Sequence, residues 1–183
     1  MKSGRMTRYV AFLRAINVGG RTVRMEALRR HFEDWGGRSV ETFIASGNVI
    51  FETPRKNVQA AEQAIEEHLQ AAVGYPVIVF LRTIPELAAI GARNPFPERE
   101  YAGGGRLFIG LMKSAADRSI VRAVAALRTD IDGFVVDGRE VYWLRRAQLM
   151  ASLAKQPAIE KAVGSPITMR NVNTVRRLAK KYC

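Results

Sequence analysis

The chain is poor in the residues that build metal and redox sites. Its 183 residues include a single cysteine and two histidines. Cys183 is the last residue, so it has no internal disulfide partner, and a chain end is a poor place for a nucleophile. His31 and His68 both fall in segments with helical spacing. A site built from His and Cys ligands is therefore excluded, and only magnesium held by carboxylates stays open as a metal.

Long apolar runs are also missing. No run approaches the roughly 18 residues that a membrane-spanning helix needs, so we expect no membrane partner. Residues 1–6 lack the apolar stretch of a signal peptide, which predicts a cytoplasmic protein. An apolar content of 48% and a charged content of 25% are typical of a globular chain. A chain of this length can bury a full core, as one domain or as two halves.

Acidic residues are scarce at the C-terminal end. The formal net charge of the whole chain is +12. Residues 1–82 contribute +4, residues 83–144 contribute zero, and residues 145–183 contribute +8 with Glu160 as their lone acid. A local basic surface is typical of proteins that bind nucleic acid or phosphorylated ligands. The alternative is an arginine-rich composition spread over solvated helix faces.

The order of predicted elements, β-α-β-β-α-β, occurs twice. In the first half, Met25, Leu28, Phe32 and Trp35 recur at spacings of three, four and three, which is one face of a helix. Apolar and β-branched runs predict the strands, and Pro and Gly mark the turns. The first half has predicted strands at 9–15, 40–45, 49–53 and 76–81, and helices at 25–35 and 58–72.

A short helix at 85–92 and a loop at 93–105 link this half to the next. The second half has predicted strands at 107–112, 134–136, 140–144 and 166–170, and helices at 117–131 and 148–163, the latter with a break at Pro157. An extra C-terminal helix follows, with Asn173 as its N-cap. The fold class is therefore α+β: two ferredoxin-like halves with antiparallel sheets, residues 1–82 and 106–183, joined by a linking helix and loop at 83–105.

This topology brings two loops together. Each split β-α-β unit gives the strand order 4-1-3-2, so the first and third strands are neighbours. The loop after the first strand then meets the turn before the third, beside the start of the first helix. Loop glycines expose backbone N–H groups, which favours an anion or polar-ligand site. The candidate ligand-binding residues are Arg14, Asn17, Gly19, Gly20, Ser46, Gly47 and Asn48.

The predicted strands are apolar without alternation, as at 77–81, 49–51 and 107–112. Such strands are buried on both faces of their sheet. The helices cover one face, so we expect the other to meet the partner half or a second subunit. This pattern disfavours an open sheet as a binding platform.

No complete catalytic motif accompanies the two loops. Ser46 lies between a strand and a glycine, but neither histidine is expected near it and no Gly-x-Ser-x-Gly elbow exists. The Asn17-Val18-Gly19-Gly20 segment lacks the spacing of a Walker loop or a dinucleotide fingerprint. Arg14 can hold a carboxylate or a phosphate with two hydrogen bonds, or pair with a neighbouring acid. Whether the protein is an enzyme, and with which cofactor, stays open.

Two other functions remain alternatives to a small anionic ligand. The basic C-terminal region favours nucleic acid, although RNA-binding sheets need several exposed aromatic residues and residues 46–51 supply Phe51 alone. Self-complementary sheets would instead give a homodimer or a protein-interaction module.

Three segments resemble a known family. They are residues 9–20, 42–51 and 168–175, the last reading Thr-Met-Arg-Asn-Val-Asn-Thr-Val. Together they resemble the bacterial domain-of-unknown-function 1697 family. The resemblance implies two ferredoxin-like α+β halves, and it implies no activity, cofactor or catalytic residue.

The C-terminal signature of that family makes Arg170, Asn171 and Asn173 secondary candidates for ligand contact, although the two asparagines also suit helix caps. The chain departs from the family pattern at two places. Val172 stands where the family usually has tryptophan, and residues 146–149 stand near a position where members often carry a serine–lysine pair.

Overall fold

The computed structural model describes residues 5–17, 19–44, 47–101, 104–146 and 156–183. The chain divides into two compact units. The first comprises Met1–Leu87 together with Tyr182–Cys183, and the second comprises Ala88–Lys181. Within the described residues, no helix combines the length and the apolar character needed to cross a membrane.

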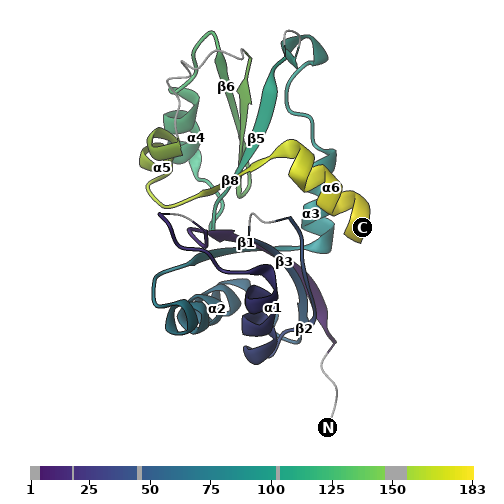
Figure 1. Ribbon diagram of the computed structural model, residues 1–183. Helices are drawn as coiled ribbons and strands as arrows, with labels where there is room; N and C mark the ends of the chain where they lie inside the picture. The colour runs from purple at the N-terminus through teal and green to yellow at the C-terminus, as the bar shows by residue number, and fades with distance from the viewer. Residues whose placement is uncertain (1–4, 18, 45–46, 102–103, 147–155) are drawn as a thin grey trace. The chain divides into compact units, whose positions relative to one another are not determined.

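The first unit is a four-stranded antiparallel sheet with two helices packed together (Figure 1). Its strand order is β2-β3-β1-β4, which confirms the predicted order. The elements are β1 (Thr7–Arg14), α1 (Met25–Asp34), β2 (Arg38–Thr42), β3 (Asn48–Thr53), α2 (Val58–Val73) and β4 (Ile78–Thr83), followed by α3 (Ile84–Ala92), which runs on into the second unit.

The second unit repeats this topology, with strand order β6-β7-β5-β8. Its helix α6 is additional to the β-α-β-β-α-β pattern. The elements are η1 (Glu98–Tyr101), β5 (Arg106–Leu111), α4 (Arg118–Ala125), β6 (Asp132–Asp137), β7 (Glu140–Arg145), α5 (Gln156–Val163), β8 (Thr168–Asn171) and α6 (Val172–Tyr182). Two ferredoxin-like sheets with an extra C-terminal helix are therefore confirmed.

Both faces of the first sheet are buried, as the apolar strands predicted. On one face, Phe51 packs against Phe32 of α1, with ring centroids 5.2 Å apart. On the other face, Val10, Phe12 and Phe80 are each 0% exposed. An open aromatic platform, as in RNA-binding sheets, is therefore absent from the described part of this unit.

Glutamates cover the outer edge of β4. An edge strand presents N–H groups that can pair with another chain. Three alternate N–H groups of β4, which do not face β1, each donate to a carboxylate at 2.8 Å: Val79 to Glu66, Leu81 to Glu62 and Thr83 to Glu86. These bonds leave few free donors for strand addition at this edge.

The second strand of the first unit differs from its prediction. A strand was expected over 40–45, whereas β2 spans Arg38–Thr42. Phe43 still faces Asn48: its N–H donates to the Asn48 carbonyl at 2.9 Å, and its own carbonyl accepts from the Asn48 side-chain amide at 3.0 Å. Ile44 then has φ = 55°, which is incompatible with a strand. The connection to β3 is therefore a longer loop than the expected tight hairpin.

Two helix boundaries in the second unit also differ, and the predicted helix start at residue 148 lies outside the described residues. Helix α4 ends at Ala125 because Leu127 and Arg128 donate three residues back, to Val124 and Ala125, in tightening turns. Pro157 lies in the first turn of α5, where proline is tolerated, and residues 147–155 fall outside the described residues. At α6, the side chain of Asn171 accepts the N–H of Asn173 at 2.9 Å, so the cap falls two residues earlier than predicted.

Candidate functional site

The end of β1 contacts the turn that precedes β3 in the first unit. The N–H of Leu13 donates to the carbonyl of Gly47 at 2.8 Å. Gly47 has φ = 72°, and a Cβ atom there would lie 2.8 Å from Ile16 Cγ2 and 3.1 Å from Leu13 Cβ. Only glycine fits this close approach. The contact places Leu13 and Ile16 against the start of β3; that the 17–20 loop itself meets the 46–48 turn stays a prediction.

Asn17 closes its own loop. Its side-chain oxygen accepts the N–H of Val23 at 2.7 Å, which spans six residues. Gly19 and Gly20 lie at the exposed tip, with φ values of 64° and 80°, and no atom lies within 4 Å of a Cβ built on either. The glycines therefore leave an open backbone surface between β1 and α1.

The other predicted residues have structural partners. Asn48 is fully buried and its amide donates to the Phe43 carbonyl. Arg14 is half-buried at the end of β1, opposite Ile78 of β4. Ser46 lies outside the described residues.

Tyr75 holds the first loop from the far side. Its hydroxyl donates to the carbonyl of Ile16 at 2.8 Å, across 59 residues of sequence. The guanidinium of Arg21 lies over the Tyr75 ring, 4.5 Å from its centroid. Such a cation–π contact orders an otherwise mobile arginine. The exposed cationic end of Arg21 is therefore held beside the glycine loop.

The start of α1 carries no side-chain cap. Arg24 occupies the N-cap position with extended backbone, and its side chain makes no capping hydrogen bond. Arg24, Ala27 and His31 share one helix face because their spacings are three and four. The N–H groups at a helix start have no partners within the helix and carry a partial positive charge.

These features line one shallow groove of about 520 Å³. Its lining includes two arginines, Arg21 and Arg24, and two aromatic residues, His31 and Tyr75; the other lining residues are Thr22, Val23, Ala27, Ala72 and Val73. None of these described lining residues carries a carboxylate. A volume in this range accommodates a small organic molecule. The groove is suited to a compact anion.

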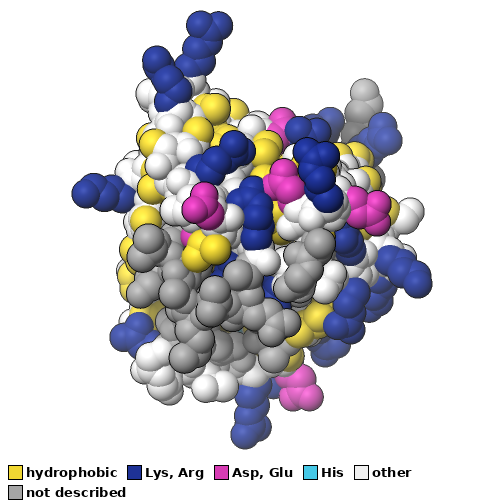
Figure 2. Space-filling view, turned by 90° about the horizontal axis from the view of Figure 1, so that it is seen from above, with side chains coloured by type: hydrophobic (Ala, Val, Ile, Leu, Met, Phe, Trp, Pro, Cys, Tyr) yellow, Lys and Arg dark blue, Asp and Glu magenta, His cyan; other side chains and the backbone are white. Residues whose placement is uncertain are grey.

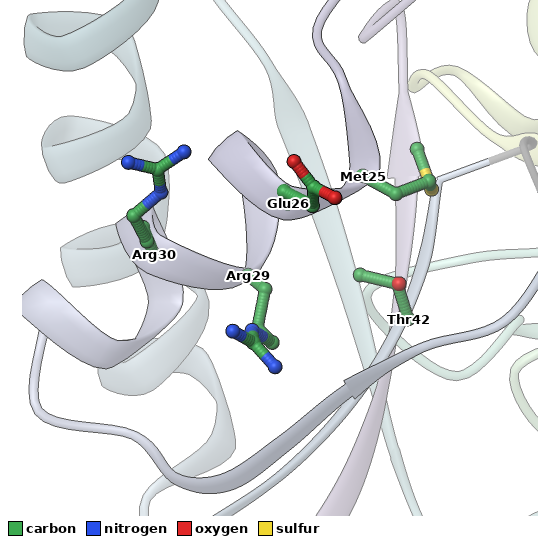
Figure 3. A pocket seen from close by; sticks show the side chains of 5 residues that line it. All are labelled: Met25, Glu26, Arg29, Arg30 and Thr42. Atoms are coloured by element: carbon green, nitrogen blue, oxygen red, sulfur yellow. The ribbon is translucent and has the colours of Figure 1, made fainter.

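A second hollow lies on another side of α1 and is less suited to an anion (Figure 3). It measures about 480 Å³ and is lined by Met25, Glu26, Arg29, Arg30 and Thr42. The Glu26 carboxylate opposes a negative ligand, and the Nε atom of Arg29 lies 3.6 Å from Glu33 Oε1. A substitution at Arg29 is therefore a suitable control for substitutions that remove a positive charge from the groove beside Tyr75.

The secondary candidates belong to the second unit, where they support its own structure. Arg170 is buried, and its guanidinium donates to Thr168 Oγ1 and to the Met169 carbonyl, both at 2.9 Å. Burial lowers the pKa of Arg170 to about 10. Asn171 caps α6 through the Asn173 N–H. The Arg170 and Asn171 side chains and the Asn173 backbone N–H therefore each make a structural contact.

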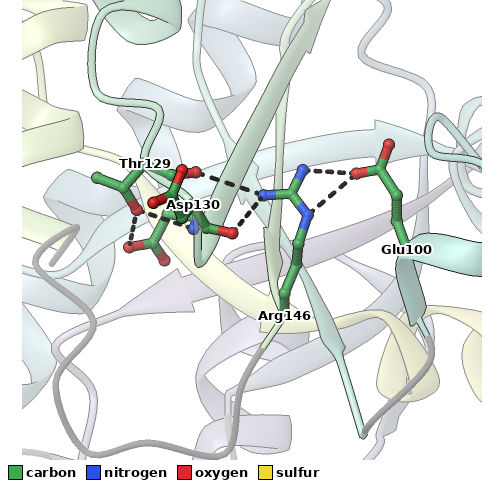
Figure 4. A network of polar contacts seen from close by, with 5 residues as sticks. Glu100, Thr129, Asp130 and Arg146 are labelled. Carbon is green, nitrogen blue, oxygen red and sulfur yellow. Dashed lines mark hydrogen bonds and ion pairs between the residues drawn. The ribbon is translucent and has the colours of Figure 1, made fainter.

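A polar network fixes the segment before β5 (Figure 4). Arg146 Nη2 donates to Glu100 Oε2 at 2.5 Å, and its Nη1 donates to the carbonyls of Thr129 and Asp130 at 3.5 and 3.4 Å. A Cβ atom at Gly133 would lie 2.7 Å from Arg146 Nη2. The Arg146 guanidinium is already engaged by Glu100 and two carbonyls, so we assign this cluster a structural role.

Among the described residues, no group of three or more His, Cys, Asp or Glu side chains is placed to hold a metal ion. The groove therefore offers cations, backbone N–H groups and an aromatic ring as its binding chemistry. Groups of this kind are suited to an anion, and they do not by themselves define a reaction.

A family model described as "Protein of unknown function (DUF1697)" matches residues 6–142. The chain belongs to this family. The match includes both loops and the groove but ends before the signature at 168–175. A solved structure, that of conserved bacterial protein SP0830 from Streptococcus pneumoniae, is 22% identical, with a TM-score of 0.72 over 97% of this chain and 99% of that one. This likeness shows the shared fold. Among curated proteins, no match was found.

Sequence reasoning did not find the groove in this family member. None of the predicted site residues is among its described lining residues, and Arg21, Arg24, His31 and Tyr75 were not identified. The two arginines had a detectable signal, because they flank a helix start that lacks Ser, Thr, Asp or Asn at its N-cap. Tyr75 had none, because its contact with Ile16 is remote in sequence.

Proposed function

We propose that the protein binds a small anionic ligand, bearing phosphate or carboxylate groups, at the converging 17–20 and 46–48 loops and in the adjoining groove. One observation carries this proposal: the groove beside the glycine loop is lined by Arg21, Arg24 and His31 with no opposing carboxylate, at a helix start that no side chain caps.

The arrangement supplies three kinds of attraction at one place. Arginine forms short, charge-assisted hydrogen bonds with carboxylate and phosphate. The start of α1 adds backbone N–H groups and a partial positive charge. Gly19 and Gly20 let the backbone approach the ligand closely, since neither carries a side chain.

Backbone conformation supports the same location. Residues other than glycine rarely adopt positive φ, and such strain is concentrated at functional sites. Ala15 has φ = 68° and Ile44 has φ = 55°. Ala15 directly follows β1 and Ile44 lies between β2 and β3, so both connections hold conformations that their own residues disfavour.

Inorganic pyrophosphate is a suitable probe, because it is compact and strongly anionic. Titration calorimetry at about 50 mM salt should detect binding, and thermal unfolding should shift upward with ligand concentration by mass action. The variant Arg21→Gln should bind about tenfold more weakly, since a charge-assisted contact contributes roughly 1.5–3 kcal/mol.

The matched control is Arg29→Gln, which removes the same charge from the second hollow. It should bind pyrophosphate as the parent does. Equal weakening by both variants would mean general attraction to a basic protein, and weakening by Arg29→Gln alone would place the ligand in the wrong hollow. Either result, or no binding by the parent, would reject the proposal.

A further inference from the structure

The helix α6 presents a cationic face that the small-anion groove does not use. Its exposed residues recur at helical spacing, and its buried residues occupy the opposite side. The exposed side carries Arg176, Arg177, Lys180 and Lys181, and the buried side carries Val172, Val175 and Leu178. We call the four basic residues the α6 basic face.

The apolar side of α6 is already covered within its own unit. A Cβ atom at Gly91 of α3 would lie 3.1 Å from Ala179 Cβ, so the two backbones approach closely there. Arg176 Nε also donates to the Gly91 carbonyl at 3.3 Å. This packing fixes which side of α6 faces the solvent.

Acidic residues are scarce along this part of the sequence. In residues 145–183, Glu160 is the lone acid among nine Lys and Arg residues. Its carboxylate accepts the N–H of Ile167 at 3.1 Å, which engages it at the edge of β8. Figure 2 shows Lys and Arg side chains projecting around the molecular face drawn there, with Asp and Glu in fewer places.

We propose that the α6 basic face binds the phosphate backbone of double-stranded nucleic acid, without reading its sequence. Helix geometry puts Arg177 and Lys181 about 6 Å apart along the axis, since each residue rises about 1.5 Å. A duplex carries one negative charge per about 1.7 Å, so several phosphates lie within reach of four cations.

The chemistry of the face distinguishes this partner from two others. A helix that lies in a membrane surface needs an exposed apolar side, and the apolar side of α6 is buried. Single-stranded binding relies on aromatic side chains that stack on bases, and the four side chains of the face are Arg and Lys. The charge of the α6 basic face therefore complements the phosphates of a duplex better than it suits either of the other two partners.

The test compares two variants that each lose three positive charges. One carries Arg177→Gln, Lys180→Gln and Lys181→Gln on α6; Arg176 is kept because it also bonds Gly91. The other carries Arg29→Gln, Arg30→Gln and Arg38→Gln, exposed positions in the first unit. Fluorescence anisotropy with labelled 20-bp duplexes of two unrelated sequences measures affinity from about 50 to 200 mM salt, and thermal melting confirms that both variants fold.

The parent should bind both duplexes equally. The α6 variant should bind at least about tenfold more weakly. The slope of log affinity against log salt should decrease in magnitude by about 2.7, because each of the three lost phosphate contacts contributes about 0.9 to that slope. The first-unit variant should keep the parent slope. Equal losses in both variants, or binding by the parent to phosphatidylserine vesicles but not to duplex, would overturn the proposal. Pyrophosphate binding by the α6 variant should stay unchanged, which separates this test from that of the groove.

Discussion

The two units share one topology but begin their first helices differently. In the first unit, ten residues (15–24) connect β1 to α1, and no side chain caps the helix. In the second unit, six residues (112–117) connect β5 to α4. There the Asp117 carboxylate accepts the N–H groups of Ser119 and Ile120 at 2.8 and 2.9 Å.

The difference lies in what occupies the same fold position in the two units. At α4, the Asp117 carboxylate caps the helix start. At α1, Arg24 occupies the N-cap without a side-chain hydrogen bond, although Glu26 lies in the first turn, and the adjoining groove is lined by Arg21. A helix start favours negative charge in both cases. Of these two helix starts, α1 is the one that no side chain caps, and the proposed anion would lie there.

The outer edges of the two sheets are more alike. The N–H of Leu81 in β4 donates to Glu62 of α2, and the N–H of Ile167 before β8 donates to Glu160 of α5, at 2.8 and 3.1 Å. In each unit the second helix thus places a carboxylate on the fourth strand. The first unit adds Glu66 and Glu86, so its edge is more fully covered.

The largest expected effect comes from removing a glutamate that accepts an N–H group at a sheet edge. Glu62 is 1% exposed, so Glu62→Ala leaves the Leu81 N–H without its partner in a buried place. We expect a loss of about 2–4 kcal/mol in the free energy of unfolding. Glu160→Ala should cost less because Glu160 is only half-buried. Urea denaturation measures the free energy of unfolding of both variants. Equal losses in the two variants would show that burial of the glutamate does not determine how much it stabilises the protein.

A smaller effect separates two hairpin glycines. Gly47→Ala puts a Cβ atom against Ile16 and Leu13, whereas the nearest atom at Gly138, between β6 and β7, is Glu140 Oε2 at 3.8 Å. Both glycines have positive φ, so both substitutions incur backbone strain. The steric clash should make Gly47→Ala costlier by about 1–3 kcal/mol. Equal unfolding midpoints in urea would contradict the observed loop contact.

The smallest stability effect concerns the capped helix. Hydrogen bonds from Ser119 and Ile120 lower the pKa of the Asp117 carboxyl. Because the folded pKa is below the unfolded one, the stabilisation is present above the unfolded pKa and is lost as pH falls through the folded pKa. Asp117→Ala should lower the urea midpoint slightly at pH 7, and the difference should shrink below about pH 4. A difference independent of pH would show that charge is not involved.

The sequence predicted the layout of the molecule better than the chemistry of its groove. Apolar spacing, Gly and Pro specified the element order, and from it followed both strand orders and the approach of the end of β1 to the turn before β3. Helix spacing also placed His31 on α1. These are local or topological signals, which survive in a single sequence.

Contacts remote in sequence were not predictable. Tyr75 reaches Ile16 across 59 residues, and Glu62 reaches Leu81 only once α2 has packed on the sheet. β2 ends early because Ile44 adopts a positive φ, and the positive φ of Ser39 bends the strand near its start. Periodicity carries no information about such pairings.

The most direct test of the central claim compares Arg24→Asn with Arg24→Gln. Both remove the same charge, but asparagine also caps the helix, as Asn57 does at α2 through the N–H of Ala60 at 3.1 Å. A cap contributes about 1 kcal/mol. Arg24→Asn should therefore raise the free energy of unfolding by about that amount relative to Arg24→Gln. If the anion binds at the uncapped start of α1, the asparagine side chain competes with it, and Arg24→Asn should bind pyrophosphate about fivefold more weakly than Arg24→Gln. Equal pyrophosphate affinities, measured by calorimetry at about 50 mM salt, would contradict the account.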